Sequence, residues 1–174
     1  AACKALGMGT MPVIIRDLTD EEAVITMVDS NLQREHILPS EKAFAYKMKM
    51  EALSHQGKTS RQVGERWSVS QISEAGTDSE RQIHRYIRLT HLISDILKLV
   101  DEGKIALTPA VELSYLQPSE QEMLFSVMDS DEVTPSLSQA RRLRHMSEAQ
   151  TLTDDAVLQL LSEVKGNQVE YVKV

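Results

Sequence analysis

The 174-residue chain is poor in several residue types, and each shortage excludes a class of protein. Its single cysteine, Cys3, can form neither an intrachain disulfide nor a cysteine-rich zinc site, and this usage fits a reducing compartment. No run reaches the roughly 18 apolar residues that span a bilayer, and the first residues lack a signal-peptide pattern. Aromatic residues make up 4% of the chain, so the core must be built mainly from aliphatic side chains.

Sequence signatures of common enzyme classes are also missing. The chain contains no P-loop, no G-x-G-x-x-G and no G-x-S-x-G. The five histidines lack metal-ligand spacing, and no cysteine accompanies them. We therefore expect no metal site and no catalytic residue.

Charge is unevenly distributed, although the net charge is −7. Residues 1–39 hold three basic and six acidic residues, and residues 101–174 hold six and thirteen. Residues 40–100 hold ten basic and seven acidic residues, so only this central part is basic. DNA binding depends on local potential rather than whole-chain charge, so the overall acidity does not exclude it.

Helix signals dominate what is present. Thr19 with Glu22, Thr77 with Glu80 and Ser136 with Gln139 have the capping-box form. Thr108 before Pro109 has the form of a helix cap followed by proline at the first helical position. One β-branched run, residues 12–16, predicts a strand. The periodicity predicts helices over residues 19–31, 41–55, 59–67, 70–75, 77–90, 94–102, 108–116, 118–128, 135–144 and 153–165.

Residues 69–88 have the pattern of a helix-turn-helix. Gly76 can adopt a positive φ at the turn, and Ile83 and Ile87 would hold the second helix against the protein. Arginine can contact guanine and glutamine can contact adenine in two-point hydrogen bonds. Two ordinary helices that meet at a glycine turn would give the same spacing, and both interpretations stay open here. The side chains expected to face DNA are Ser79, Arg81, Gln82 and Arg85.

Three blocks together resemble the ParB-like partition-protein family. They are residues 29–46 (DSNLQREHILPSEKAFAY), 81–89 (RQIHRYIRL) and 99–113 (LVDEGKIALTPAVEL). The family forms are E-N-L-Q-R-x-x-L-x-P-x-E-x-A-x-A-Y, R-x-V-x-R-Y-I-R-L and a D-x-G-K turn that leads into a helix. The blocks match in the right order within roughly residues 10–145.

The resemblance implies a mainly α fold, a multi-helix bundle that contains a helix-turn-helix and has a small truncated α/β N-terminal remnant. Residues 1–38 would be the remnant, 39–146 the DNA-binding domain, and 147–174 a linker, an amphipathic helix and a tail. The chain is then expected to be a fragment that lacks the family's C-terminal dimerisation domain.

The function that the resemblance implies is sequence-specific binding of double-stranded DNA at a centromere-like, parS-type site in plasmid or chromosome partition. It also implies a homodimer in function, a ParA-type ATPase as partner of the full-length protein, and a cytoplasmic, nucleoid-associated location without membrane contact. Three alternatives stay open. They are a transcription regulator of a mobile element, a CTP-dependent DNA clamp, and a helical interaction module without DNA binding.

The family binds CTP and magnesium through a G-E-R-R loop and the E-N-x-x-R motif. This chain has no such loop, and Ser30 replaces the motif's glutamate, a better magnesium ligand than a hydroxyl. Asn31 and Arg34 are then remnants of the nucleotide site, although Arg34 could equally form a structural ion pair. We expect no cofactor in this fragment, whereas CTP and magnesium remain possible in the full-length protein.

Two further groups of basic residues have two interpretations each. The first could contact DNA phosphates or could be a solvated helix face, and the second could contact DNA or balance the surrounding acidic residues, the interpretation we favour. In the first group, Lys58 and Arg61 are the preferred DNA contacts. The groups are Lys42, Lys47, Lys49, Lys58, Arg61 and Arg66, and Arg141, Arg142 and Arg144.

Overall fold

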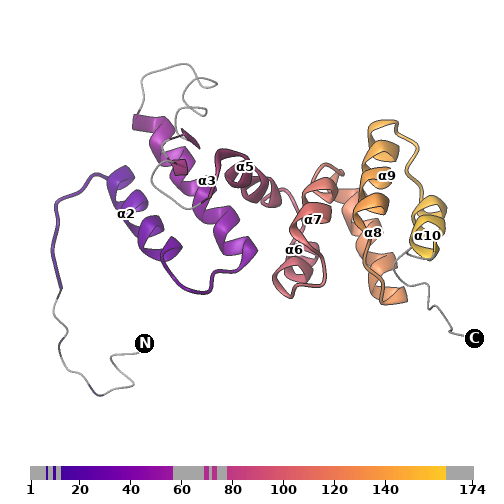
Figure 1. The fold of residues 1–174 in the computed structure, drawn as a ribbon, viewed down its shortest axis with the longest axis horizontal. Helices are drawn as coiled ribbons and strands as arrows, with labels where there is room; N and C mark the ends of the chain where they lie inside the picture. Colours follow the sequence, from indigo (N-terminus) through magenta and orange to yellow (C-terminus); the bar gives the residue numbers. More distant parts are fainter. Residues whose placement is uncertain are drawn as a thin grey trace, which may run out of the picture.

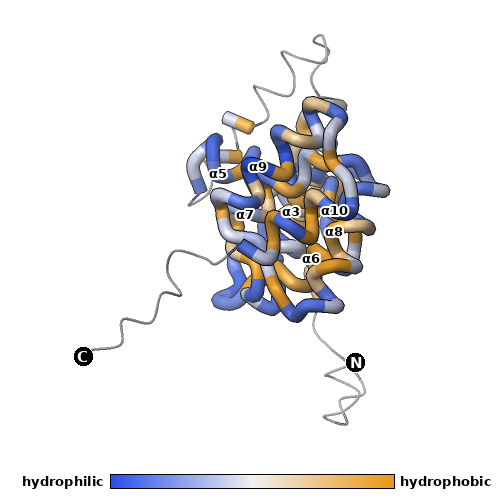
Figure 2. The backbone as a smooth tube through the Cα atoms, turned by 90° about the vertical axis from the view of Figure 1, so that its right-hand side faces the viewer, coloured by the Kyte–Doolittle hydropathy of each residue, from blue (hydrophilic) through white to orange (hydrophobic). Residues whose placement is uncertain are grey.

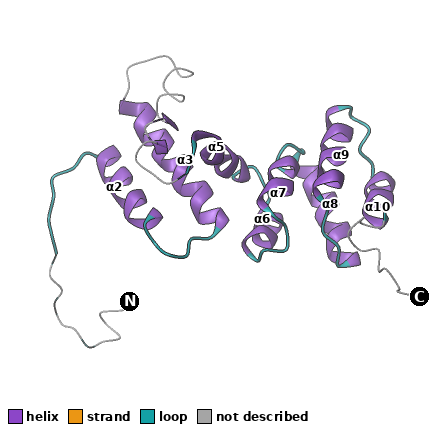
Figure 3. Cartoon of the chain, in the orientation of Figure 1, coloured by secondary structure: helices purple, strands orange, loops and turns teal. Residues whose placement is uncertain are grey.

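The computed structural model of the protein describes Gly7, Thr10 and residues 13–56, 69–70, 72–73 and 78–163. These residues form eight α-helices and no strand (Figures 1 and 3). The helices are α2 (Asp20–Leu32), α3 (Pro39–Gln56), α5 (Glu80–Leu89), α6 (Ser94–Asp101), α7 (Leu107–Leu113), α8 (Pro118–Asp131), α9 (Leu137–Glu148) and α10 (Asp154–Ser162). The mainly α fold class is confirmed.

Local capping signals account for several helix starts. The capping boxes of Thr19 before α2 and Ser136 before α9 are both formed, because each side chain reaches a backbone N–H within three residues. Pro118 is the first residue of α8, as expected from its fixed φ. Gly103 follows α6 with a φ of +74°, a conformation that glycine adopts without strain.

Two helix starts differ from the expectation. The N-cap of α5 is Ser79 rather than Thr77, because the carboxylate of Asp78 is bound by side chains of α3 and the helix begins just after it. The N-cap of α7 is Ala106 rather than Thr108, which lies inside the helix and accepts a hydrogen bond from Arg85 instead.

The prediction of a strand over residues 12–16 is wrong for residues 13–16, the described part of this range. Val13, Ile14 and Ile15 have no regular secondary structure and are 67–89% exposed. A strand needs a neighbour to pair its backbone N–H and C=O groups, and the described residues offer none. The α/β character expected for the N-terminal remnant is therefore not seen in the described chain.

The helices form a row, with α2, α3 and α5 at one end and α8, α9 and α10 at the other (Figure 1). Helix α3 packs against both α2 and α5, and α5 also packs against α7. Helix α7 packs against α9, and α10 packs against α8 and α9. Helix α3 also packs against α6, and Ser40 of α3 donates hydrogen bonds to Asp101 of α6, so α3 and α5 both connect the two ends of the row.

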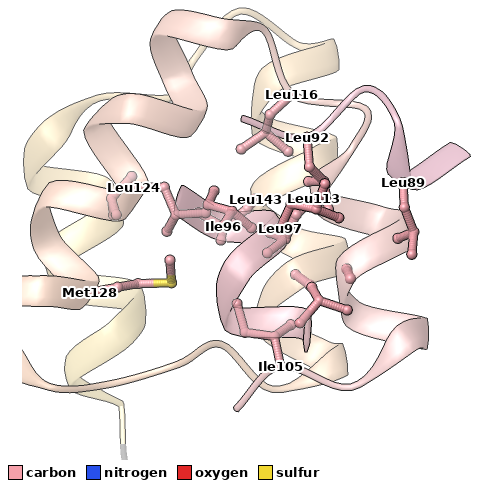
Figure 4. Close-up of a cluster of buried hydrophobic side chains, with 14 of the residues drawn as sticks. Leu89, Leu92, Ile96, Leu97, Ile105, Leu113, Leu116, Leu124, Met128 and Leu143 are labelled. Atoms are coloured by element: carbon pink, nitrogen blue, oxygen red, sulfur yellow. The ribbon is translucent and has the colours of Figure 1, made fainter. Parts of the chain in front are cut away.

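The main core lies chiefly between α6, α7, α8, α9 and α10, and Ala43 of α3 and Leu89 of α5 also belong to it. Leu113, Leu124 and Leu143 have no exposed surface, and their side chains converge with those of Ile96 and Met128 (Figure 4). Apolar and polar residues are interspersed along these helices (Figure 2), as expected for helices that bury one face. A smaller cluster of Tyr46, Val69, Ile72 and Ile83 lies between α3, the described residues 69–70 and 72–73, and α5.

The expected helix over residues 153–165 forms as α10, with Thr153 as its N-cap, and it ends at Ser162. Val157, Leu160 and Leu161 join the main core, so α10 is packed against the other helices. The helix expected over residues 59–67, together with Gly57 and Gly76, lies outside the described residues. None of the described helices is long and apolar enough to cross a membrane.

Candidate DNA-binding surface

Helix α5 has one buried and one charged face. Ile83 and Leu89 are buried on the side of the core, whereas Arg81 and His84 are exposed. Val69 and Ile72 share the small cluster with Ile83, as the first helix of a helix-turn-helix would require. Residues 74–77, where the turn was expected, lie outside the described residues.

The start of α5 is held against α3 by a polar cluster. The carboxylate of Asp78 accepts hydrogen bonds from Lys42 Nζ at 2.6 Å and from Tyr46 Oη at 2.5 Å. Lys42 also lies 4.9 Å from the ring centroid of Tyr86, in cation–π geometry. The next residue, Ser79, caps α5 by accepting from the Gln82 N–H, so the polar cluster sets where the helix begins.

The pKa values of this cluster reflect the same contacts. Burial alone would raise the pKa of Asp78, but the hydrogen bonds from Lys42 and Tyr46 and the charge of Lys42 outweigh it and lower the pKa. Burial and the bond to Asp78 raise the pKa of Tyr46. At neutral pH Asp78 is therefore a carboxylate and Tyr46 a neutral phenol.

The Arg85 side chain is half-buried and has partners on two helices. Its Nη1 donates to Gln82 Oε1 at 3.2 Å, one turn earlier in α5, and its Nη2 donates to Thr108 Oγ1 at 2.5 Å in α7. Two of the four candidate residues are arginines, and Arg81 is more exposed than Arg85. The Ser79 side chain is occupied as the cap of α5.

Arg88 was not among the candidate residues. Its Nε and Nη2 donate to the hydroxyl and the carbonyl oxygen of Ser114 at 3.1 and 2.8 Å. Its guanidinium also lies 4.0 Å from the ring centroid of Tyr115, and Arg144 of α9 lies 3.8 Å from the same centroid. This stack could not be read from the sequence, because its three members come from separate segments.

A shallow depression lies between α5 and α7 on the charged side of α5. Three arginines line it, with only one carboxylate, so its potential is positive. Its lining residues are Glu80, Arg81, His84, Arg85, Arg88, Val111 and Tyr115. Close by, partial desolvation and the charges of Arg88 and Lys47 lower the pKa of His91. Among the described residues no group of three histidines, cysteines or carboxylates could hold a metal ion.

The upstream basic residues have diverse surroundings. Lys42 is bound to Asp78, and Lys49 forms an ion pair with Asp29 although its side chain is only 7% exposed. Lys49 is therefore buried and paired, and it does not lie on a solvated helix face. The side chains of Lys58 and Arg61 lie outside the described residues.

The residues expected to remain from a nucleotide site lie at the end of α2. Asn31 is half-buried and Arg34 is exposed, and both line an apolar groove between α2 and α3. Arg34 also lines a second cavity of about 700 Å³ beside Lys42 and Lys49. The Ser30 hydroxyl donates to the carbonyl oxygen of Thr26, one turn earlier in α2.

The arginines of α9 are paired with carboxylates. Arg144 donates to Glu112 at 3.0 Å and to Glu148 at 2.8 Å, and Arg142 donates to Glu163 at 2.5 Å. The preferred interpretation, that these arginines balance nearby acidic residues, agrees with these contacts.

The fold and this surface together define a class of protein: a helical protein that carries an arginine-lined helix at its surface. Over 138 residues the chain is 30% identical to the chromosome-partitioning protein Spo0J of Thermus thermophilus, a match that covers 79% of this chain and 46% of that protein. Over 109 residues it is 32% identical to the probable chromosome 1-partitioning protein ParB of Deinococcus radiodurans, covering 63% and 33%. No family model matches the chain.

Both relatives are chromosome-partitioning proteins of the kind that the three sequence blocks resemble. The chain therefore belongs to the ParB-like family, as the resemblance implied. It spans less than half the length of each of these two relatives.

Proposed function

We propose that this chain binds double-stranded DNA through α5 and that the protein acts in chromosome or plasmid partition. The observation that carries the proposal is the arginine-lined depression beside α5, in a chain related to two chromosome-partitioning proteins. Arg81 and Arg85 would contact base edges or phosphates, and the described N-cap of α5 would face the duplex. Ser79 precedes these arginines as the N-cap of the same helix, and Gln82 lies between them.

We infer that Lys58 and Arg61 add phosphate contacts upstream of α5. The target would be a centromere-like, parS-type site, and its inverted repeat would require two copies of the chain. The protein would then act as a homodimer on the nucleoid in the cytoplasm, with a ParA-type ATPase as partner. In this proposal the chain is a DNA-binding protein rather than a classical enzyme, and Asn31 and Arg34 are remnants of a nucleotide site.

The proposal is tested by fluorescence anisotropy with duplexes that tile the DNA around the protein's own gene. We expect saturable binding to one inverted repeat, with an affinity that falls as salt rises because phosphate contacts release counterions. Replacing Arg85 by Ala should weaken binding to that repeat by roughly 5- to 100-fold.

Arg142→Ala is the matched control, since it removes an arginine of α9 that is paired with Glu163. It should bind as the unaltered protein does. Absence of binding by a folded protein at low salt, also after fusion to a dimerising coiled coil, would refute DNA binding through α5. Loss of a mini-plasmid that carries the bound repeat, when the gene is deleted, would distinguish partition from transcription control.

A further inference from the structure

Arg85 is held more firmly than a solvent-exposed arginine. One partner, Gln82, lies on its own helix, and the other, Thr108, lies on α7. All three side chains are half-buried. A free arginine side chain samples many rotamers and loses that freedom when it binds, whereas a side chain fixed beforehand loses less.

The two hydrogen bonds leave Arg85 able to bind a ligand. A guanidinium carries five N–H groups, and these bonds use one on each terminal nitrogen. Three N–H groups remain, and a two-point contact with guanine needs two. Arg85 can therefore keep both supports while it contacts a base.

The same hydrogen bonds give Arg85 and Gln82 different roles: Arg85 contacts the base and Gln82 holds Arg85 in place. Recognition of adenine by glutamine needs the side-chain oxygen and nitrogen together. The Gln82 oxygen accepts from Arg85 with one of its two lone pairs, and this bond fixes both side chains, so Gln82 supports the arginine.

The Thr108 hydroxyl is not needed to hold α7 in the fold. Ala110 and Leu113 of the same helix are fully buried in the main core, and the N-cap of α7 is Ala106. The hydrogen bond that Thr108 accepts from Arg85 is thus a link to α5 that the packing of α7 does not require.

From this geometry we propose that Thr108 is a specificity-determining residue, which acts by positioning the Arg85 guanidinium for one base pair. Gln82 is the second support of the same guanidinium. The proposal rests on the proposed function, since it needs α5 to contact DNA bases. Because Thr108 acts through Arg85, its loss changes which sequence is preferred more than how strongly DNA is bound.

The experiment uses the full chain and a library of duplexes with about 20 randomised base pairs, a span that covers two half-sites one helical turn apart. Bound duplexes are sequenced for the unaltered protein and for the Arg85→Ala, Thr108→Val and Thr108→Ser variants. Valine keeps the shape of threonine without its hydroxyl, and serine keeps the hydroxyl.

We expect Arg85→Ala to abolish the preference at one base pair of the selected site. Thr108→Val should reduce the preference at that base pair by roughly 3- to 10-fold, the effect of losing one ordinary hydrogen bond. Thr108→Ser should restore it. Binding to the unselected library and the thermal midpoint should stay the same for both variants, which a purely structural role of Thr108 would not permit.

One outcome would overturn only the role of Thr108, and another would also overturn the proposed function of α5. If Arg85→Ala loses the preference while Thr108→Val keeps it, Thr108 does not position the arginine. If the unaltered protein and Arg85→Ala select the same sequence, or none, α5 does not read bases, and both the proposed function of α5 and the role of Thr108 fail.

Discussion

The helices at the two ends of the row are stabilised in different ways. The C-terminal group, α6 to α10, shares one continuous aliphatic core. The N-terminal group, α2, α3 and α5, has a small cluster around Tyr46 and Ile83, and it adds ion pairs and hydrogen bonds between its helices. Of the ten large hydrophobic side chains that are exposed in the described part of the chain, eight lie within residues 13–48.

This difference suggests how stability and function are divided. A large apolar core gives cooperative stability that depends little on pH. Polar contacts between helices depend on charge, and α5, the proposed DNA-binding helix, is attached to α3 by such contacts and to α7 by Arg85 and Arg88. Changes in the two groups should therefore have effects of different size and different pH dependence.

The largest effect is expected in the main core. Leu113→Ala should lower the free energy of unfolding by about 2–5 kcal/mol, because Leu113 has no exposed surface and its removal leaves a cavity. Phe44→Ala, at a side chain that is 47% exposed in the N-terminal group, should cost less than about 1 kcal/mol. Urea titrations followed by circular dichroism measure both values. Equal losses would contradict the division between the two groups.

The next effect concerns Asp78. Asp78→Asn should lower the free energy of unfolding by about 1–2 kcal/mol at pH 7, because it weakens charged hydrogen bonds to Lys42 and Tyr46. The folded pKa of Asp78 lies below its ordinary value of 3.8, so its contribution is present above that value and is lost as the pH falls toward the lowered pKa.

The free energy of unfolding of the unaltered protein and of Asp78→Asn, measured between pH 7 and pH 3, tests whether the contribution of Asp78 falls on acidification. The difference between unaltered protein and Asp78→Asn should be constant from pH 7 to about pH 5. It should shrink as the pH falls through 3.8, because Asp78 then takes up its proton in the unfolded chain before it does so in the folded protein. A difference that grows on acidification would contradict this assignment.

An effect of comparable size, but asymmetric between the two partners, is expected for the pair of Asp29 and Lys49. Asp29→Asn leaves the buried Lys49 ammonium without its carboxylate and should cost about 1–3 kcal/mol. Lys49→Met leaves Asp29, whose side chain is 44% exposed, free to be hydrated, and it should change stability by less than about 1 kcal/mol. Urea titration of the two variants should give unequal midpoints, and the opposite order would show that burial of Lys49 is not what makes the pair matter.

The smallest effect is expected on α9. Arg142→Ala removes an ion pair with Glu163 whose two side chains are 49% and 45% exposed. Because water screens such pairs, the free energy of unfolding should change by less than about 0.5 kcal/mol. Thermal melts at low and high salt check this. A large salt-dependent loss would show that the α9 pairs stabilise the C-terminal group.

Much of the helical pattern could be predicted because its causes are local. The capping boxes at Thr19 and Ser136 involve residues three positions apart, and both are formed. Local pattern was misleading where a distant contact competed with it. Thr108 has the sequence context of an N-cap but binds Arg85, and residues 12–16 have strand-forming composition without a partner strand among the described residues.

The sequence by itself determined that this protein is helical, where most of its helices begin, and that it belongs to the ParB-like family, because periodicity, caps and ordered motifs are properties of neighbouring residues. Only the tertiary structure decided which charged side chains are occupied. Lys42 meets Asp78 and Arg85 meets Thr108 across 36 and 23 residues of chain. Such pairs depend on how helices pack against one another, which no local pattern specifies.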